Sequence, residues 1–389
     1  MQSGFMRPSS LVVLAHVLIA LSARAQEPRL IAADTSAVEA PYEFSEIGEV
    51  FALADGRVIV RDKMEQVVLL VDFRAGTSVA VGKIGDGPGE YRGAFKLIRL
   101  GGDSVGIIDA ANPRILALTM HGTVGGFVSP NSKHPVSGSS LAAIRADGRG
   151  WLYSQRSKTR GSGNNATVTD SVDIFRWRPG TEPAELVGAF RNPPPEGAMV
   201  TATGHLVVRP GATPVLAPTP TWVVGDDGTI GIVNAVPFRV DFISPSGERS
   251  IGEVIPYAKV PVTEAIKESF RKAFARPQYA YIMDRATQTT TRAKMPPAPF
   301  RNENWAKELP AFLYDGFLGF APDGTLWIQR TTIGTEGALY DLVGRDGRLR
   351  DRVRFPDGHR VVGFGRDAMY VVRRDANDLE YLQRRSLPR

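Results

Sequence analysis

The sequence predicts an all-β protein that folds as a six-bladed β-propeller, and three observations lead to this expectation. A turn that begins with Asp recurs just before a β-type stretch: Asp55-Gly56, Asp103-Ser104, Asp147-Gly148, Asp227-Gly228, Asp323-Gly324 and Asp367-Ala368. Successive turns lie 48, 44, 80, 96 and 44 residues apart, and three of these intervals match the length of a four-stranded blade. The 40 glycines and 28 prolines are typical of a turn-rich chain, and a hydrophobic content of 43% is enough for a core.

The first blade follows the turn at Asp55-Gly56. Short β-branched runs at 58–60, 66–71 and 78–81 are separated by turns rich in Gly and Asp. Such runs are what antiparallel hairpins in a meander require. The second blade repeats the scheme at 96–100, 105–108, 115–118 and 124–128, with Asp109 and Gly122 matching Asp62 and Gly76 of the first blade.

Two segments of these blades carry a family resemblance. The run Ile108-Asp109-Ala110-Ala111-Asn112-Pro113-Arg114-Ile115, followed by His121-Gly122, resembles the core of an NHL repeat. Residues 82–91 resemble the glycine-rich link, ending in an aromatic residue, that joins blades in bacterial six-bladed propeller families. The resemblance covers residues 48–127 and implies an NHL-like six-bladed propeller; the other blades match it only by their turns and spacing.

Blades three and four contain longer connections. Strands are predicted at 151–153 and 173–177, and residues 157–169, rich in Ser, Gly, Asn and Thr, are predicted to form a flexible loop that carries the glycosylation sequon of Asn165. Proline-rich tracts at 192–195 and 210–220 interrupt the fourth blade, which resumes at 222–224.

The interval before blade five contains an insertion, residues 259–310. Ile266, Phe270 and Phe274 recur at every fourth position, so residues 264–275 are predicted to form an amphipathic helix that Thr263 caps and Pro277 ends. Residues 302–309 are predicted to form a second short helix. An insertion of this size does not fit inside a blade, so we expect it to lie across one face of the propeller.

Blades five and six are predicted from 316–354 and 361–382, and the chain then ends one strand short of a full sixth blade. Residues 29–34 are expected to supply that strand, so that an N-terminal strand closes the ring and no strand edge is left open.

The first residues predict export. Arg7, the apolar run 11–21 and the sequence Ala23-Arg24-Ala25 have the form of a signal peptide, which assigns residues 1–25 to the signal and 26–389 to a single propeller domain. The apolar run is shorter than the roughly 20 residues that cross a bilayer, so no transmembrane segment is expected. The chain has no cysteine, which excludes a lipoprotein anchor on Cys, so the predicted location is periplasmic or extracellular.

The charge distribution argues against nucleic acid as a partner. Loss of Arg7 and Arg24 with the signal lowers the formal net charge from +6 to +4, and the remaining excess is spread along the chain. Binding to nucleic acid requires a clustered basic patch. We expect a monomer with a solvated basic surface.

Few residues predict catalysis. The four histidines of the mature chain, His121, His134, His205 and His359, are not placed to form a zinc site. Ser104 lies in a G-x-S-x-G sequence but enters a strand, whereas a catalytic serine of that motif precedes a helix. Carboxylates near inner strands, Glu46, Glu49 and Asp315, are candidates for a calcium site, since calcium prefers oxygen ligands.

Three functions remain open from the sequence. The leading prediction is an exported, non-enzymatic binding or scaffold protein without a cofactor, which contacts a peptide, glycan or protein through Phe270, Arg271, Phe274 and Trp305 of the insertion. The alternative is a calcium-dependent lactonase or esterase with the metal at the propeller channel. The third is a structural module in a surface assembly.

Overall fold

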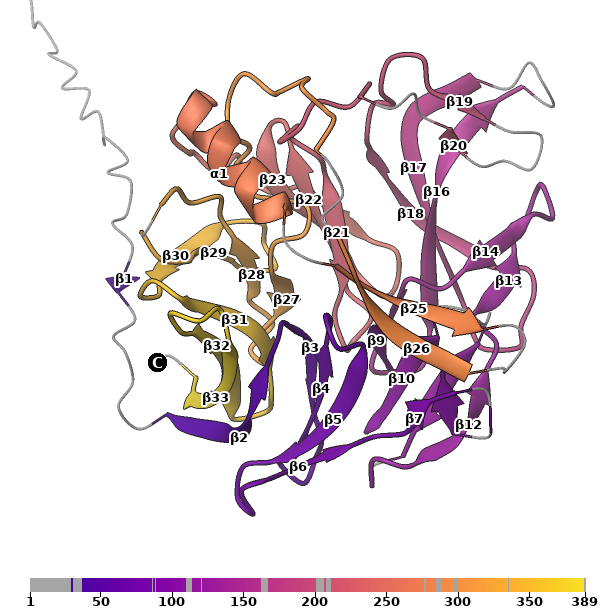
Figure 1. Cartoon of the computed structure of the whole chain (residues 1–389). Helices are drawn as coiled ribbons and strands as arrows, with labels where there is room; N and C mark the ends of the chain where they lie inside the picture. Colours follow the sequence, from indigo (N-terminus) through magenta and orange to yellow (C-terminus); the bar gives the residue numbers. More distant parts are fainter. Residues whose placement is uncertain are drawn as a thin grey trace, which may run out of the picture.

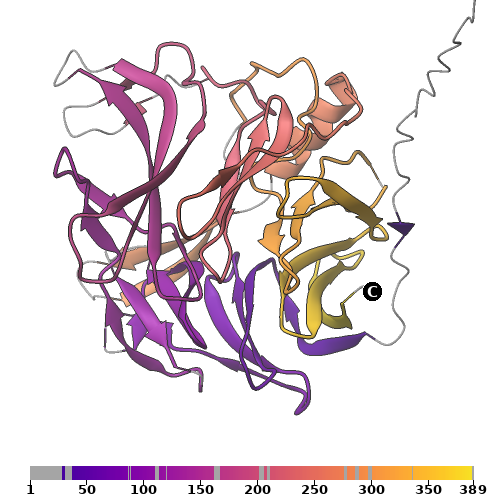
Figure 2. The ribbon, with the colours of Figure 1, turned by 180° about the vertical axis from the view of Figure 1, so that it is seen from behind.

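The computed structural model describes residues 29–387 apart from 31–36, 86, 88, 110–113, 120, 162–166, 201–205, 208–210, 276–277, 285–288, 297–299 and 335. The predicted signal peptide, the sequon at Asn165, His205 and the Asn112-Pro113 part of the NHL-like run lie outside the described residues. The described chain forms a six-bladed β-propeller, in which six largely antiparallel sheets, five of four strands and one of five, are arranged in a ring (Figures 1 and 2).

The sheets follow one another along the chain. The first three are β3 (Ile47–Ala52), β4 (Val58–Asp62), β5 (Val67–Asp72) and β6 (Thr77–Ala80); β9 (Ala94–Gly101), β10 (Ser104–Asp109), β11 (Ile115–Leu118) and β12 (Val124–Val128); and β15 (Arg145–Ala146), β16 (Leu152–Arg160), β17 (Thr167–Trp177) and β18 (Glu185–Arg191). The last three are β21 (Thr221–Val224), β22 (Ile230–Ala235), β23 (Phe238–Ile243) and β24 (Arg249–Ser250); β27 (Leu318–Phe320), β28 (Leu326–Gln329), β29 (Leu339–Val343) and β30 (Leu349–Arg354); and β31 (His359–Phe364), β32 (Ala368–Arg374), β33 (Glu380–Ser386) and β2 (Val38–Phe44).

In the described chain, four small two-stranded sheets lie in the segments that connect the strands of the blades. They are β7 (Lys83–Ile84) with β8 (Glu90–Tyr91), β13 (Asn131–Lys133) with β14 (Ser140–Ala142), β19 (Met199–Val200) with β20 (Leu206–Val207), and β25 (Gln278–Asp284) with β26 (Thr289–Met295).

The six turns that predicted the fold are confirmed, because each connects the inner strand of a sheet to its second strand. The turn chemistry is local. Oδ1 of Asp55 accepts the backbone N–H of Arg57 at 3.0 Å, and Oδ1 of Asp227 accepts that of Thr229 at 3.0 Å. Gly56 (φ +89°) takes a backbone conformation that few other residues tolerate.

Asp62, which the sequence matched with Asp109, organises the turns around the end of β4. Its buried carboxylate accepts four backbone N–H groups, from Ser45 (2.8 Å), Glu46 (3.4 Å), Met64 (3.0 Å) and Glu65 (3.0 Å). An Asp at this position therefore builds the blade.

The strand expected to complete the sixth blade was assigned to the wrong residues. Arg29 and Leu30, which form β1 (Arg29–Leu30), pair in parallel with β30 of the fifth sheet. The outer strand of the sixth sheet is β2, which pairs antiparallel with β33. Ala40 and Phe44 of β2 are buried in the core between the sixth and first sheets. The prediction was based on hydrogen bonding at the sheet edge and did not include this burial.

The predicted flexible loop at 157–169 is also wrong in part. β16 and β17 continue their pairing outward as far as Arg160 and Thr167. The polar composition suggested a loop, but it reflects a hairpin arm whose residues 158–161 are exposed.

The insertion contains the predicted helix, α1 (Glu264–Phe274), with Oγ1 of Thr263 accepting the N–H of Ile266 at 3.4 Å. The hairpin of β25 and β26 was not predicted. The second helix at 302–309 is wrong: this segment is extended because the amides of Asn302 and Asn304 donate to the backbone oxygens of Thr213 (3.0 Å) and Gly211 (3.1 Å).

Hydrophobic clusters fill the space between neighbouring sheets. Trp222 and Trp327 lie in two of them with exposed fractions of 0% and 3%, so both pack between blades. Trp151 is partly buried against the same cluster as Trp222, and the guanidinium groups of Arg176 and Arg178 lie over its ring at 4.7 and 4.6 Å from the ring centre. In the part of the chain described, no helix has the length and apolar character needed to span a membrane.

Candidate functional site

The six inner strands, β3, β9, β15, β21, β27 and β31, line a central channel of about 1110 Å³. Their beginnings lie at one face of the ring, which we call the entry face. Two contacts join neighbouring inner strands there: Nζ of Lys96 on β9 donates to the carbonyl of Ile144, directly before β15, at 3.0 Å, and Nε of Arg145 on β15 donates to that of Trp222 on β21 at 2.9 Å.

The insertion belongs to the same face. It enters β27 at the beginning of that inner strand, and its hairpin lies in front of the blades in Figure 1 and behind them in Figure 2. The expectation that the insertion lies across a face of the propeller agrees with these views.

The four predicted contact residues of the insertion are brought together around Phe300. Phe270 packs edge-on against Phe300 and Trp305, with ring centres 5.9 and 5.7 Å apart, and Phe274 packs against Phe300 at 5.3 Å. Arg271 lies over the Trp305 ring at 5.4 Å. This aromatic cluster fastens α1 to the extended segment that follows the hairpin, and Phe274, 42% exposed, remains at its edge.

Glu303 connects the charged part of this cluster. It accepts from Nη2 of Arg271 at 2.6 Å and from the indole N–H of Trp305 at 3.2 Å. The guanidinium of Arg271 holds the pKa of Glu303 below its usual range, and the indole N–H acts in the same direction. Arg271 and Trp305 are thus engaged within the insertion itself.

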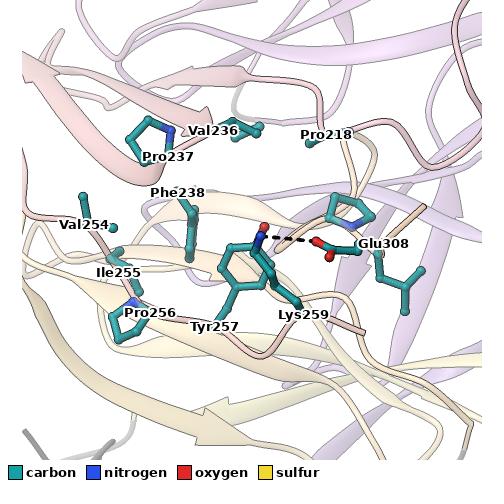
Figure 3. Close-up of a pocket in the computed structure, with 13 residues that line it drawn as sticks. Pro218, Val236, Pro237, Phe238, Val254, Ile255, Pro256, Tyr257, Lys259 and Glu308 are labelled. Atoms are coloured by element: carbon teal, nitrogen blue, oxygen red, sulfur yellow. Dashed lines mark ion pairs between the residues drawn. The ribbon is translucent and has the colours of Figure 1, made fainter. Parts of the chain in front are cut away.

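An apolar pocket of about 380 Å³ lies at the foot of the insertion, which is where its two ends, Lys259 and residues 308–310, join the propeller (Figure 3). It is formed by the β22–β23 turn, by residues 254–257 and by the two ends of the insertion, which run side by side where Val262 donates to the carbonyl of Lys307 at 3.0 Å. Phe238 and Tyr257 meet edge-on inside it, with ring centres 6.0 Å apart. The complete lining is Pro218, Ala235, Val236, Pro237, Phe238, Val254, Ile255, Pro256, Tyr257, Lys259, Glu308, Leu309 and Pro310.

The rim of this pocket combines exposed apolar side chains with one ion pair. Val236 and Val254 are 70% and 61% exposed, which is unusual for side chains of this type. Nζ of Lys259 lies 3.5 Å from Oε2 of Glu308 beside Tyr257 (Figure 3). A pocket of this size, apolar inside with a charged rim, suits one or two apolar side chains of a ligand.

The carboxylates named for calcium do not form a metal centre. Glu46 is paired with Lys63 at 2.9 Å, and Glu49 is paired with Arg61 at 2.6 Å. Asp315 precedes β27 on another blade. Within the described ranges no three His, Cys, Asp or Glu side chains converge as metal ligands would, so the residues present there do not fit the expected calcium site.

The other candidate motifs are structural. Ser104 opens β10, so no helix follows it, and it sits in a hairpin as the sequence indicated. His121 lies in the turn between β11 and β12, and Nδ1 of His134 accepts backbone N–H groups from Val136 and Ser137 at 3.2 and 3.1 Å.

Sequence reasoning missed Val236, Val254, Lys96 and Arg145. Val236 lies in a turn and Val254 in an irregular connection, and the two cations are 49 positions apart in different blades. Four prolines, Pro218, Pro237, Pro256 and Pro310, line the pocket and are a signal for it in the sequence.

Comparison with known proteins does not identify a family for this chain. No known protein-family profile matches the chain. No curated protein matches it in sequence. The resemblance to NHL repeats therefore stays a prediction.

Solved structures of similar shape include the calcium-binding protein regucalcin from Agrobacterium tumefaciens, with 11% identity, a TM-score of 0.42 and coverage of 92% of this chain and 96% of that chain. A gluconolactonase from Xanthomonas campestris has 11% identity and a TM-score of 0.40, covering 92% and 95%. Virginiamycin B lyase from Staphylococcus aureus has 11% identity and a TM-score of 0.37, covering 90% and 98%. At these identities and TM-scores the likeness carries no conclusion about the activity or ligand of this chain.

Proposed function

We propose that this propeller is an exported binding protein that captures a peptide segment of a partner in the pocket at the foot of its insertion. The observation that carries the proposal is the open apolar pocket of about 380 Å³ with exposed valines on its rim. Exposed apolar side chains gathered around a concavity are typical of protein contact sites. The signal-like residues 1–25 support export.

A peptide is favoured over a glycan by the kind of surface present. Glycan sites usually offer an open aromatic face, but Arg271, Phe270 and Phe300 surround the ring of Trp305. The pocket instead offers proline and valine surface for an apolar side chain, and Lys259 and Glu308 can pair with charges that flank it.

The proposal is tested with a phage-displayed library of random peptides selected on the purified protein. Selected peptides should share an apolar residue, and Val236→Lys should weaken their binding by about tenfold or more, because it replaces one of the exposed apolar side chains of the rim with a charge. The matched control is Val79→Lys, since Val79 is 60% exposed on β6 of the first blade, outside the pocket. Phe274→Ser tests the predicted contribution of the insertion's aromatic edge in the same assay.

Two results would contradict the proposal. One is that no peptide is enriched, or that Val236→Lys and Val79→Lys bind the selected peptides equally well. The other is hydrolysis of a lactone or ester that stops when EDTA is added, which would favour the calcium-dependent hydrolase instead.

A further inference from the structure

Three arginines at or next to the entry face each donate to a backbone carbonyl and also to a carboxylate. Each arginine holds two segments of the ring together, and its charge is paired with a carboxylate, which is shared with a second arginine at Asp341 and Glu380. The three sets are Arg61 with the carbonyl of Ala94 (3.3 Å) and Glu49 (2.6 Å), Arg330 with the carbonyl of Ala311 (2.7 Å) and Asp341 (2.7 Å), and Arg360 with the carbonyl of Ile47 (2.9 Å) and Glu380 (2.7 Å).

Lys96 and Arg145 make the same kind of carbonyl contact without the carboxylate. Lys96 on β9 donates to Ile144, Arg145 on β15 donates to Trp222, and neither forms an ion pair with any residue that the structure describes. Cζ of Arg145 also lies over the Trp222 ring, 4.7 Å from the ring centre, a cation–π contact that holds the guanidinium at this position. Two fixed cations therefore lie side by side in the channel wall without a counter-charge of their own.

The groups that interact with Lys96 and Arg145 leave this pair of cations with a net positive charge. The carboxylate whose charge stabilises the Lys96 ammonium, Glu49, is already hydrogen-bonded to Arg61. The group that interacts electrostatically with Arg145 is the hydroxyl of Tyr314. Burial lowers the pKa of the Lys96 ammonium to about 8, and the charges of Arg145 and Arg61 add to this effect while Glu49 opposes it. An anion placed between Lys96 and Arg145 would relieve this repulsion.

We infer that Lys96 and Arg145 form an anion-binding site in the channel, which takes the carboxylate or phosphate group of a small organic molecule. Nε of Arg145 is used by the Trp222 carbonyl, but its two terminal nitrogens make no hydrogen bond within the described residues and offer a fork to an oxyanion. The ammonium of Lys96 adds a point charge beside it. The channel, about 1110 Å³, has room for the body of the ligand, with the exposed ring of Tyr314 on its wall.

A purely structural role does not account for the missing carboxylates. Arg61, Arg330 and Arg360 show that a cation that is paired with a carboxylate makes the same carbonyl contact. An unneutralised, partly buried cation costs stability unless it has a partner. A ligand that supplies the negative charge explains why the pair is left without one.

The test uses isothermal titration with benzoate and phenyl phosphate, which share a ring and differ in their anionic group, at pH 7 and low ionic strength. At least one probe should bind the native protein, and Lys96→Met should weaken it by about tenfold or more, the loss of one charge-assisted contact. The control is Lys63→Met, a cation in the same channel whose charge Glu46 already neutralises. The affinity of Lys63→Met for the probe should stay within about twofold of that of the native protein.

A second measurement separates the site from general attraction to a basic surface. Binding to the native protein should weaken between pH 7 and pH 9 as Lys96 loses its proton, and the residual binding of Lys96→Met should not change over this range. Absence of binding by both probes, or an equal loss in Lys96→Met and Lys63→Met, would overturn the inference. Selected peptides should bind Lys96→Met as they bind the native protein, so this result is independent of the peptide pocket.

Discussion

The buried carboxylate of Glu380 joins the last blade to the first, and replacing it with glutamine should destabilise the whole ring. Glu380, 0% exposed on β33, accepts the backbone N–H of Ile47 in β3 at 2.6 Å. It also accepts from Nη2 of Arg360 and Nη2 of Arg374, both at 2.7 Å. Glu380→Gln keeps the shape and one acceptor oxygen but removes the negative charge between two arginines.

The magnitude follows from the exposure of the partners. Removing one partner of a buried ion pair costs about 3–5 kcal/mol. The side chains of Arg360 and Arg374 are 27% and 30% exposed, so water compensates part of their lost pairing. We expect Glu380→Gln to lower the free energy of unfolding by about 2–4 kcal/mol.

The assay is urea unfolding followed by tryptophan fluorescence and circular dichroism. Glu336→Gln is the control, because Glu336 is 63% exposed and pairs with Arg354 at 3.3 Å on the surface, where a change within about 0.5 kcal/mol is expected. The reasoning is refuted if Glu380→Gln unfolds at the same urea concentration as the control. It is also refuted if Glu380→Gln and Arg360→Met have additive effects, since residues in one network must be coupled.

Two further predictions concern the channel and the contact between blades. The pKa of Lys96 is about 8 in the folded protein against 10.5 ordinarily, so the unfolded chain binds more protons than the folded protein between these pH values. The free energy of unfolding of the native protein should therefore rise from about pH 8 to pH 10 relative to that of Lys96→Met. Parallel curves of the two free energies against pH, measured by denaturation, would contradict this. Gly347→Ala should lower the free energy of unfolding by about 2 kcal/mol or more, because its Cβ would lie 2.3 Å from Cα of Gly252. Gly247→Ala, also at positive φ but in open space, should lose less in thermal unfolding; equal losses would argue against the clash.

Much of the fold could be predicted because its signals are local. An Asp side chain that accepts a backbone N–H two residues later, followed by a residue that tolerates positive φ, sets a turn with a handful of neighbouring residues, as at Asp55 and Asp227. The helix at 264–275 was predicted for the same reason, since its cap and its apolar stripe lie within one short segment.

The candidate sites depend on contacts between distant segments. Phe270, Arg271, Phe274 and Trp305 were chosen from the sequence as contact residues, but only the structure shows that Phe300 and Glu303 engage most of them within the insertion. The apolar pocket is formed by four separated stretches of chain, so no single stretch of sequence predicts it.

The sequence by itself determined the number of blades, because each blade carries a turn that is encoded in a few consecutive residues. It also determined the place of the inserted helix, whose cap and apolar stripe lie within one short segment. Only the tertiary structure decided that β2 rather than residues 29–34 pairs with β33, and that Lys96 and Arg145 share one wall of the channel. These outcomes follow from packing around the whole ring, where burial of Ala40 and Phe44 and the alignment of neighbouring inner strands outweigh any local preference.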